Sequence, residues 1–277
     1  MIPSHEVPLE DALDIAAHYH QQNNLVLADR TYRDILKAAP DHFDALHHLS
    51  IVCYQRGKKD EAARLIVHAR DLINQDENAN ARFWNNYAVI MAETGKMALA
   101  LYGWDQALGM DPAFIDALSS KAHALWNIEN YEEAEKLCRQ ALAIDPDFFD
   151  AQLNLGNALA AQGRHEEAIE IWRAITISKP FYAQSWNNIG NALRELGRLK
   201  ESEEACRKAL ELDPKLVYAM NNLGNVLRDQ GHPLDAEALF RKAVSLKPDY
   251  AEAQNNLGVA LIDQQRFEEA ATALRTP

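Results

Sequence analysis

The sequence has few cysteines, a deficit of basic residues and no long apolar run. Its three cysteines, Cys53, Cys138 and Cys206, are odd in number and widely spaced, which argues against a disulfide framework or a zinc site. The 28 Lys and Arg residues face 41 Asp and Glu residues, giving a net charge of −13. Phosphate and anionic lipid are bound by clustered Lys and Arg, so we expect neither a nucleic-acid nor a membrane-surface partner.

The chain also lacks the segments that direct a protein to or across a membrane. Met1–Glu10 has no basic run followed by an apolar stretch, so we expect no signal peptide. No run approaches the ~20 apolar residues of a membrane span. An apolar content of 48% is too high for an intrinsically disordered chain. We therefore predict a folded protein in a reducing, cytoplasmic compartment.

Catalytic and cofactor motifs are missing as well. The sequence has no Gly-rich phosphate loop, no Cys-x-x-Cys pair and no His-Glu-x-x-His. His42, His47 and His48 form a histidine cluster, but adjacent helical side chains diverge by about 100°, which disfavours a shared metal. We predict no catalytic residue, no cofactor and no metal in this chain.

What the sequence does contain is a repeat. Prolines recur at a constant interval of 34 residues: Pro112, Pro146, Pro180, Pro214 and Pro248. Glycines follow the same interval: Gly156, Gly190, Gly224 and Gly258. An interval of this length is the signature of a solenoid built from stacked supersecondary units.

With the proline at position 32, eight units follow an N-terminal extension at 1–8. They cover 9–42, 43–80, 81–114, 115–148, 149–182, 183–216, 217–250 and a truncated 251–277. Positions 8 and 20 are small, and position 24 is bulky in most units. This pattern predicts two amphipathic helices per unit, near positions 1–14 and 17–30, which approach closely at the small residues. We expect the eight units to form one array.

The sequence departs from the repeat at two places, and each departure leads to a prediction. In the second unit Asn74 replaces the proline, and residues 75–80 lengthen the link to the next unit by four residues. This insertion predicts a changed superhelical pitch, or else a tolerated surface loop. The chain stops at Pro277 without a polar capping helix. We expect it to be part of a longer protein, or its end to be covered by a partner or by self-association.

The repeat resembles the tetratricopeptide repeat family from Leu9 onward. The family signature is legible in the seventh unit as Leu223-Gly224, Leu227, Ala236, Phe240 and Pro248. The resemblance implies an all-α, right-handed superhelical solenoid whose concave groove is lined by the first helix of each unit. It also implies a protein-interaction function. No unit carries the Lys at position 5 or the Arg at position 6 with which co-chaperone members grip a carboxylate, so we expect no such clamp.

Asparagine recurs on the face that the resemblance assigns to the groove. Because asparagine is a mediocre helix former, its recurrence within a helix needs a reason. Amides can pair with the backbone of an extended peptide, or they can bridge neighbouring helices within the scaffold. The candidate peptide-binding amides are Asn86, Asn154, Asn157, Asn188, Asn191, Asn222, Asn225 and Asn256.

Three further residues of this face are candidate contacts. Trp126 is a candidate anchor for a ligand or a packing residue. Arg194 and Arg228 carry charges that either add selectivity for a ligand or are simply solvated. The amide row is similar to the N-terminal array of O-linked N-acetylglucosamine transferase and related bacterial proteins, in which the array binds the polypeptide acceptor. We therefore expect a recruiting region of a larger glycosyltransferase; the competing hypothesis is a freestanding scaffold or oligomer.

Overall fold

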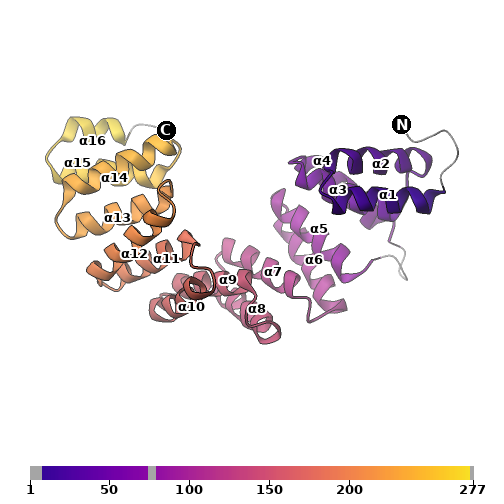
Figure 1. Cartoon of the computed structure of the whole chain (residues 1–277), viewed down its shortest axis with the longest axis horizontal. Helices are drawn as coiled ribbons and strands as arrows, with labels where there is room; N and C mark the ends of the chain where they lie inside the picture. The colour runs from indigo at the N-terminus through magenta and orange to yellow at the C-terminus, as the bar shows by residue number, and fades with distance from the viewer. Residues whose placement is uncertain (1–7, 74–78, 275–277) are drawn as a thin grey trace. The chain divides into compact units, whose positions relative to one another are not determined.

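The computed structural model describes residues 8–73 and 79–274, which form sixteen α-helices and no strand (Figure 1). The first eight helices are α1 (Leu9–Gln21), α2 (Leu25–Ala38), α3 (Phe43–Gln55), α4 (Lys59–Asp71), α5 (Ala81–Glu93), α6 (Met97–Met110), α7 (Ile115–Asn127) and α8 (Tyr131–Ile144). The remaining eight are α9 (Phe149–Ala161), α10 (His165–Ser178), α11 (Ala183–Glu195), α12 (Leu199–Leu212), α13 (Val217–Asp229), α14 (Pro233–Leu246), α15 (Ala251–Asp263) and α16 (Phe267–Ala273).

The helices confirm the all-α repeat fold predicted from the sequence. Each odd-numbered helix, the first helix of its unit, begins at the residue predicted to open that unit. Each even-numbered helix follows as the second helix of its unit. The first and second helices contact each other in the pairs α1–α2, α3–α4, α5–α6, α9–α10, α11–α12, α13–α14 and α15–α16. None of the described helices is long and apolar enough to cross a membrane.

The turn between the two helices always passes through the left-handed backbone region at position 15. Glycine suits that conformation, and Gly57 and Gly231 adopt it with φ of 76° and 85°. Three units place Asn23, Glu129 or Gln265 there instead, with φ between 57° and 65°. The turn geometry is therefore kept even where the sequence lacks the favoured residue.

Within a unit, the small residue at position 8 makes room for the bulky residue at position 24. A Cβ on Gly224 would lie 2.5 Å from Phe240, and one on Gly156 would lie 2.3 Å from Nε1 of Trp172. Phe240 is fully buried and Trp172 is 3% exposed. The two helices of these units therefore pack at a distance that only glycine permits.

The described chain divides into an N-terminal unit, Met1–Ala124, and a C-terminal unit, Leu125–Pro277. Within the C-terminal unit α11 contacts α13 and α13 contacts α15, so the first helices of neighbouring repeats lie against one another. We call the surface of α9, α11, α13 and α15 the first-helix face. The predicted single array stays a prediction, and the insertion at Asn74 begins outside the described residues.

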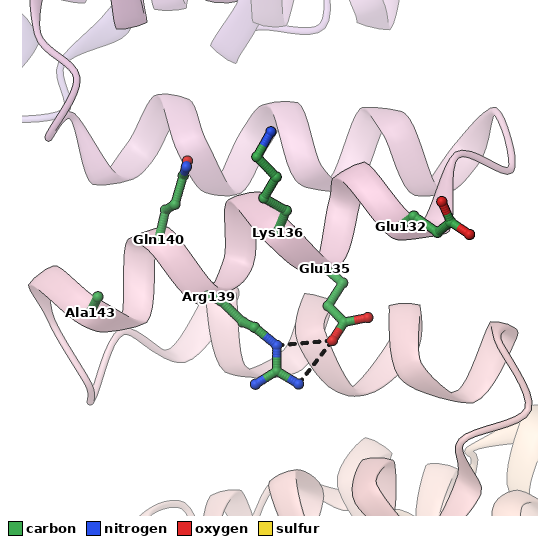
Figure 2. Close-up of a pocket in the computed structure, with 6 residues that line it drawn as sticks. All are labelled: Glu132, Glu135, Lys136, Arg139, Gln140 and Ala143. Atoms are coloured by element: carbon green, nitrogen blue, oxygen red, sulfur yellow. Dashed lines mark hydrogen bonds and ion pairs between the residues drawn. The ribbon is translucent and has the colours of Figure 1, made fainter.

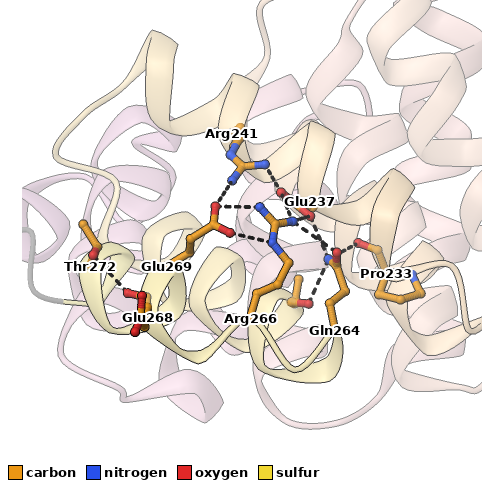
Figure 3. Close-up of polar contacts among 9 residues, drawn as sticks. Pro233, Glu237, Arg241, Gln264, Arg266, Glu268, Glu269 and Thr272 are labelled. Atoms are coloured by element: carbon orange, nitrogen blue, oxygen red, sulfur yellow. Dashed lines mark hydrogen bonds and ion pairs between the residues drawn. The ribbon is translucent and has the colours of Figure 1, made fainter.

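Neighbouring repeats are also joined by a polar clamp that the sequence analysis missed. At the last junction Glu237 accepts hydrogen bonds from Gln264 (2.7 Å) and Arg266 (2.8 Å) and pairs with Arg241, and Arg266 also pairs with Glu269 (Figure 3). The Glu237 side chain is 5% exposed. A carboxylate so deeply buried is stable because three donor side chains, those of Arg241, Gln264 and Arg266, surround it.

An equivalent clamp joins the fourth and fifth repeats. Glu135 accepts hydrogen bonds from Gln162 (2.9 Å) and Arg164 (2.7 Å) and pairs with Arg139 on its own helix (Figure 2). Burial alone would raise the pKa of Glu135, but these three hydrogen bonds outweigh it and the pKa lies below its ordinary value. At the junction of the fifth and sixth repeats, Ile169 stands at the position of the glutamate and Leu196 at that of the glutamine. An apolar pair therefore replaces the polar one there.

Candidate functional site

Four of the five asparagines at position 6 bridge adjacent repeats. In the C-terminal unit Nδ2 of Asn222 donates to Oδ1 of Asn187, and Nδ2 of Asn256 donates to Oδ1 of Asn221, both at 2.9 Å. In each case the acceptor is the position 5 amide of the preceding repeat. We call this set of bonds the amide ladder, and it corresponds to the scaffold alternative that the sequence left open.

The ladder adapts where its usual acceptor is absent. The fifth repeat has Leu153 at position 5, and Nδ2 of Asn188 donates instead to Oδ1 of Asn157, at position 9, over 3.3 Å. In the N-terminal unit, the second repeat has His47 at position 5, and its Nε2 pairs with Nδ2 of Asn86 in the third repeat at 3.0 Å. Asn154 lies half-buried on α9 and also has a partner.

The pairing of Asn86 with His47 leads to a prediction about pH. Burial, followed by the charges of His48 and Arg82, lowers the pKa of His47 to about 3. Because an unfolded histidine binds its proton near pH 6.5, the unfolded chain takes up a proton below that pH and the folded chain does not. The contribution of neutral His47 to the free energy of unfolding is therefore complete above pH 6.5, and it is lost as the pH falls towards 3.

We therefore expect the free energy of opening of α3 to fall by roughly 1–2 kcal/mol between pH 7 and pH 5 through His47. Amide hydrogen exchange of α3, compared between the wild type and His47→Gln, measures this contribution. The glutamine variant should lose less stability over the same pH interval. An equal loss in both proteins would show that His47 does not carry the effect.

Part of the first-helix face is open and polar. Here Asn188 and Asn191 of α11 and Asn222 of α13 line a cavity of about 400 Å³ together with Tyr218, Tyr250 and Glu252. The side-chain amide of Asn191 is exposed and has no partner among the described residues. No described residue donates to Oδ1 of Asn222. Its Nδ2 uses one N–H in the bond to Asn187, and the second N–H of this primary amide remains for another acceptor. We call this space the amide–tyrosine cavity.

Trp126 lines a second cavity on the same face, of about 270 Å³. Its Nε1 donates to the backbone carbonyl of Asn157 at 3.2 Å, and the residue is half-buried. Ala160, Ala161 and Asn191 line the same space. Trp126 is therefore packed against the following repeat. The cavity that it borders and the amide–tyrosine cavity share Asn191 as a lining residue.

The remaining candidates are already engaged or buried. Nε of Arg194 pairs with Asp229 at 2.6 Å, and Arg228 lies 3.8 Å from the same carboxylate, so these charges are largely neutralised within the fold. Asn225 is 7% exposed, and its Oδ1 is buried without a partner. Asn256 is 9% exposed and bridges repeats. None of the four presents a free amide or an unpaired charge to a ligand.

The second-helix surface of α8 has a shallow depression of a different kind. Glu132, Lys136, Gln140 and Ala143 form a stripe along that helix, beside the ion pair of Glu135 and Arg139 (Figure 2). Lys136 pairs with Glu133 at 3.0 Å. A lysine paired with a glutamate three residues away on the same helix is typical of a solvated helix surface.

The described residues show no grouping suited to a metal ion or to thiol chemistry. No three His, Cys, Asp or Glu side chains among them converge. Burial raises the pKa of the Cys53 thiol to about 11 and those of Cys138 and Cys206 to about 12. All three cysteines are free and buried, and they serve as small apolar packing residues.

Comparison with known proteins identifies the repeat. Profiles described as Tetratricopeptide repeat match residues 13–71, 128–188, 181–249 and 227–276. No protein with a curated description matches the chain in sequence.

Solved structures share the fold at low sequence identity. A tetratricopeptide repeat protein from Parabacteroides merdae has a TM-score of 0.72 at 17% identity, with 91% of this chain and 98% of that chain covered. MamA from Desulfovibrio magneticus has a TM-score of 0.56 at 21% identity, with 63% and 99% covered. YrrB, described as a TPR protein with an unusual peptide-binding site, has a TM-score of 0.52 at 21% identity, with 69% and 96% covered. On its repeats, its helix pairs and these matches, the chain belongs to the tetratricopeptide repeat family.

Proposed function

We propose that the chain binds an extended polypeptide along the first-helix face of its C-terminal unit. The observation that carries this proposal is the amide–tyrosine cavity, which the exposed and unpartnered amide of Asn191 lines together with Asn188 and Asn222. An extended backbone offers alternating N–H and C=O groups. Such a backbone matches a surface on which amides present both donors and acceptors.

The amides divide into two roles under this proposal. Asn256 and the buried partners Asn187 and Asn221 hold adjacent repeats together. Asn191 contacts the peptide, and Asn188 and Asn222 do both, because each bridges through one N–H and still faces the cavity. Bridging then fixes the spacing at which the free amide groups meet a peptide.

The test uses a display library of random-sequence peptides, with affinities of the selected peptides measured by calorimetry. Asn191→Ala should weaken binding roughly 3–10-fold, the value of one hydrogen bond, without changing the unfolding transition. Gln140→Ala removes an exposed amide from α8 and is the matched control, which should bind as the wild type does. If no peptide is selected, or if both variants bind equally well, the proposal is wrong.

The resemblance of the amide row leads us to propose further that the peptide is the acceptor of a cytoplasmic protein glycosyltransferase, with a catalytic domain outside these residues. Reading the gene beyond codon 277 tests this directly. The competing scaffold hypothesis predicts self-association through the last repeat, which light scattering over a concentration series would detect. A monomer at all concentrations would reject that hypothesis.

A further inference from the structure

Two tyrosines and a carboxylate form one side of the amide–tyrosine cavity. The rings of Tyr218 and Tyr250 meet edge to face, with centroids 5.2 Å apart and planes at 70°. Oε1 of Glu252 accepts a hydrogen bond from Nδ2 of Asn221 at 2.8 Å, and its Oε2 accepts one from the Tyr250 hydroxyl at 3.3 Å. These bonds hold the carboxylate beside the rings while leaving the residue exposed.

The charge of this cavity has one sign. Among the described residues that line it, Glu252 alone carries a formal charge, and the others are amides and tyrosines. Burial, followed by the charge of Glu252, raises the pKa of Tyr250, so its hydroxyl stays protonated and donates to the carboxylate. A cationic side chain would therefore meet a carboxylate, amide oxygens and aromatic rings.

A cation already lies against these rings within the chain. Nζ of Lys247 is 5.2 Å from the ring centroid of Tyr218 and 5.5 Å from that of Tyr250, and it donates to the Tyr218 hydroxyl at 3.1 Å. Lys247 does not line the cavity. The two tyrosine rings therefore already have an ammonium group within the range of a cation–π contact, and Tyr218 itself is 42% exposed.

We propose that this cavity receives a lysine or arginine side chain of the bound peptide, with Glu252 as its counter-ion. The proposal rests on the peptide-binding function proposed above and adds a sequence preference to it. Backbone contacts to amides are indifferent to sequence, whereas a carboxylate beside two rings favours a cation. An acidic side chain would be repelled by Glu252, and an apolar one would leave the amide groups without partners.

The test compares peptides selected from the random-sequence display library by three proteins: the wild type, Glu252→Gln and Glu211→Gln. Glutamine at 252 keeps an oxygen for Asn221 and removes the charge. Glu211 is an exposed carboxylate on α12 that pairs with Lys208, and it is the matched control. We expect one position rich in Lys and Arg with the wild type and with Glu211→Gln, and no such enrichment with Glu252→Gln.

Calorimetry then gives the size of the effect. A selected peptide should bind the wild type roughly fivefold more tightly with lysine than with norleucine at that position, and Glu252→Gln should remove the difference. Lys247→Met, which frees the ring faces, should strengthen binding of the lysine peptide. Selection of peptides without Lys or Arg enrichment, or enrichment that survives Glu252→Gln, would overturn the cation pocket alone. Selection of no peptide at all would instead refute the peptide-binding function.

Discussion

Replacing Phe240 by alanine is expected to lower the free energy of unfolding of the C-terminal unit by about 3–5 kcal/mol. Phe240 is fully buried and fills the space left by Gly224 on the facing helix. The surrounding helices of a solenoid repeat cannot collapse onto the void without losing contact with their neighbours. Urea unfolding followed by circular dichroism measures the loss.

The glycine opposite provides an independent check of the same contact. Alanine is about 1 kcal/mol better than glycine in a helix, so Gly109→Ala on α6, where a Cβ would meet nothing within 4 Å, should stabilise the protein. Gly224→Ala should destabilise it, because the added carbon would lie 2.5 Å from Phe240. Equal effects at the two glycines would contradict the close packing described here.

Replacing Glu237 by alanine is expected to cost about 1–3 kcal/mol, chiefly at the junction between the last two repeats. The variant leaves Gln264 and Arg266 without the buried carboxylate to which both donate (Figure 3). We place the cost below that of a fully buried ion pair, since the side chains of Arg266 and Arg241 are 34% and 48% exposed. Hydrogen exchange of α15 and α16 should report the loss first.

The chain itself suggests the control for this prediction. Its fifth and sixth repeats have Ile169 and Leu196 where the clamp has glutamate and glutamine. The double variant Glu237→Ile with Gln264→Leu copies that arrangement and should recover most of the stability lost in Glu237→Ala. If the double variant is as unstable as the single one, the two arrangements are not equivalent.

The helices could be predicted from the sequence because each depends on local signals repeated many times. Eight first helices begin at the expected residues, and the pairing of Gly224 with Phe240 follows from small and large residues at fixed positions. The left-handed turns at Glu129 and Gln265 could not be predicted from residue type, because neither residue favours that conformation. There the packing of two adjacent helices determines the backbone.

The candidate site was harder to predict because it depends on pairs of residues in different repeats. Recurrence identified the asparagines, but whether Asn222 bridges or binds depends on its neighbour Asn187, some 35 residues away. The polar clamp did leave a signal, since the glutamate, glutamine and arginine of Glu135, Gln162 and Arg164 recur as Glu237, Gln264 and Arg266. Comparing positions across repeat boundaries would have found it.

A crystal structure of the chain with a selected peptide is the most direct test of the account. We predict an extended peptide on the first-helix face, its main chain hydrogen-bonded to the amide of Asn191, with the bond from Asn222 to Asn187 intact. A peptide seated on the second-helix surface, or one that binds only after that bond breaks, would contradict the division between bridging and binding amides.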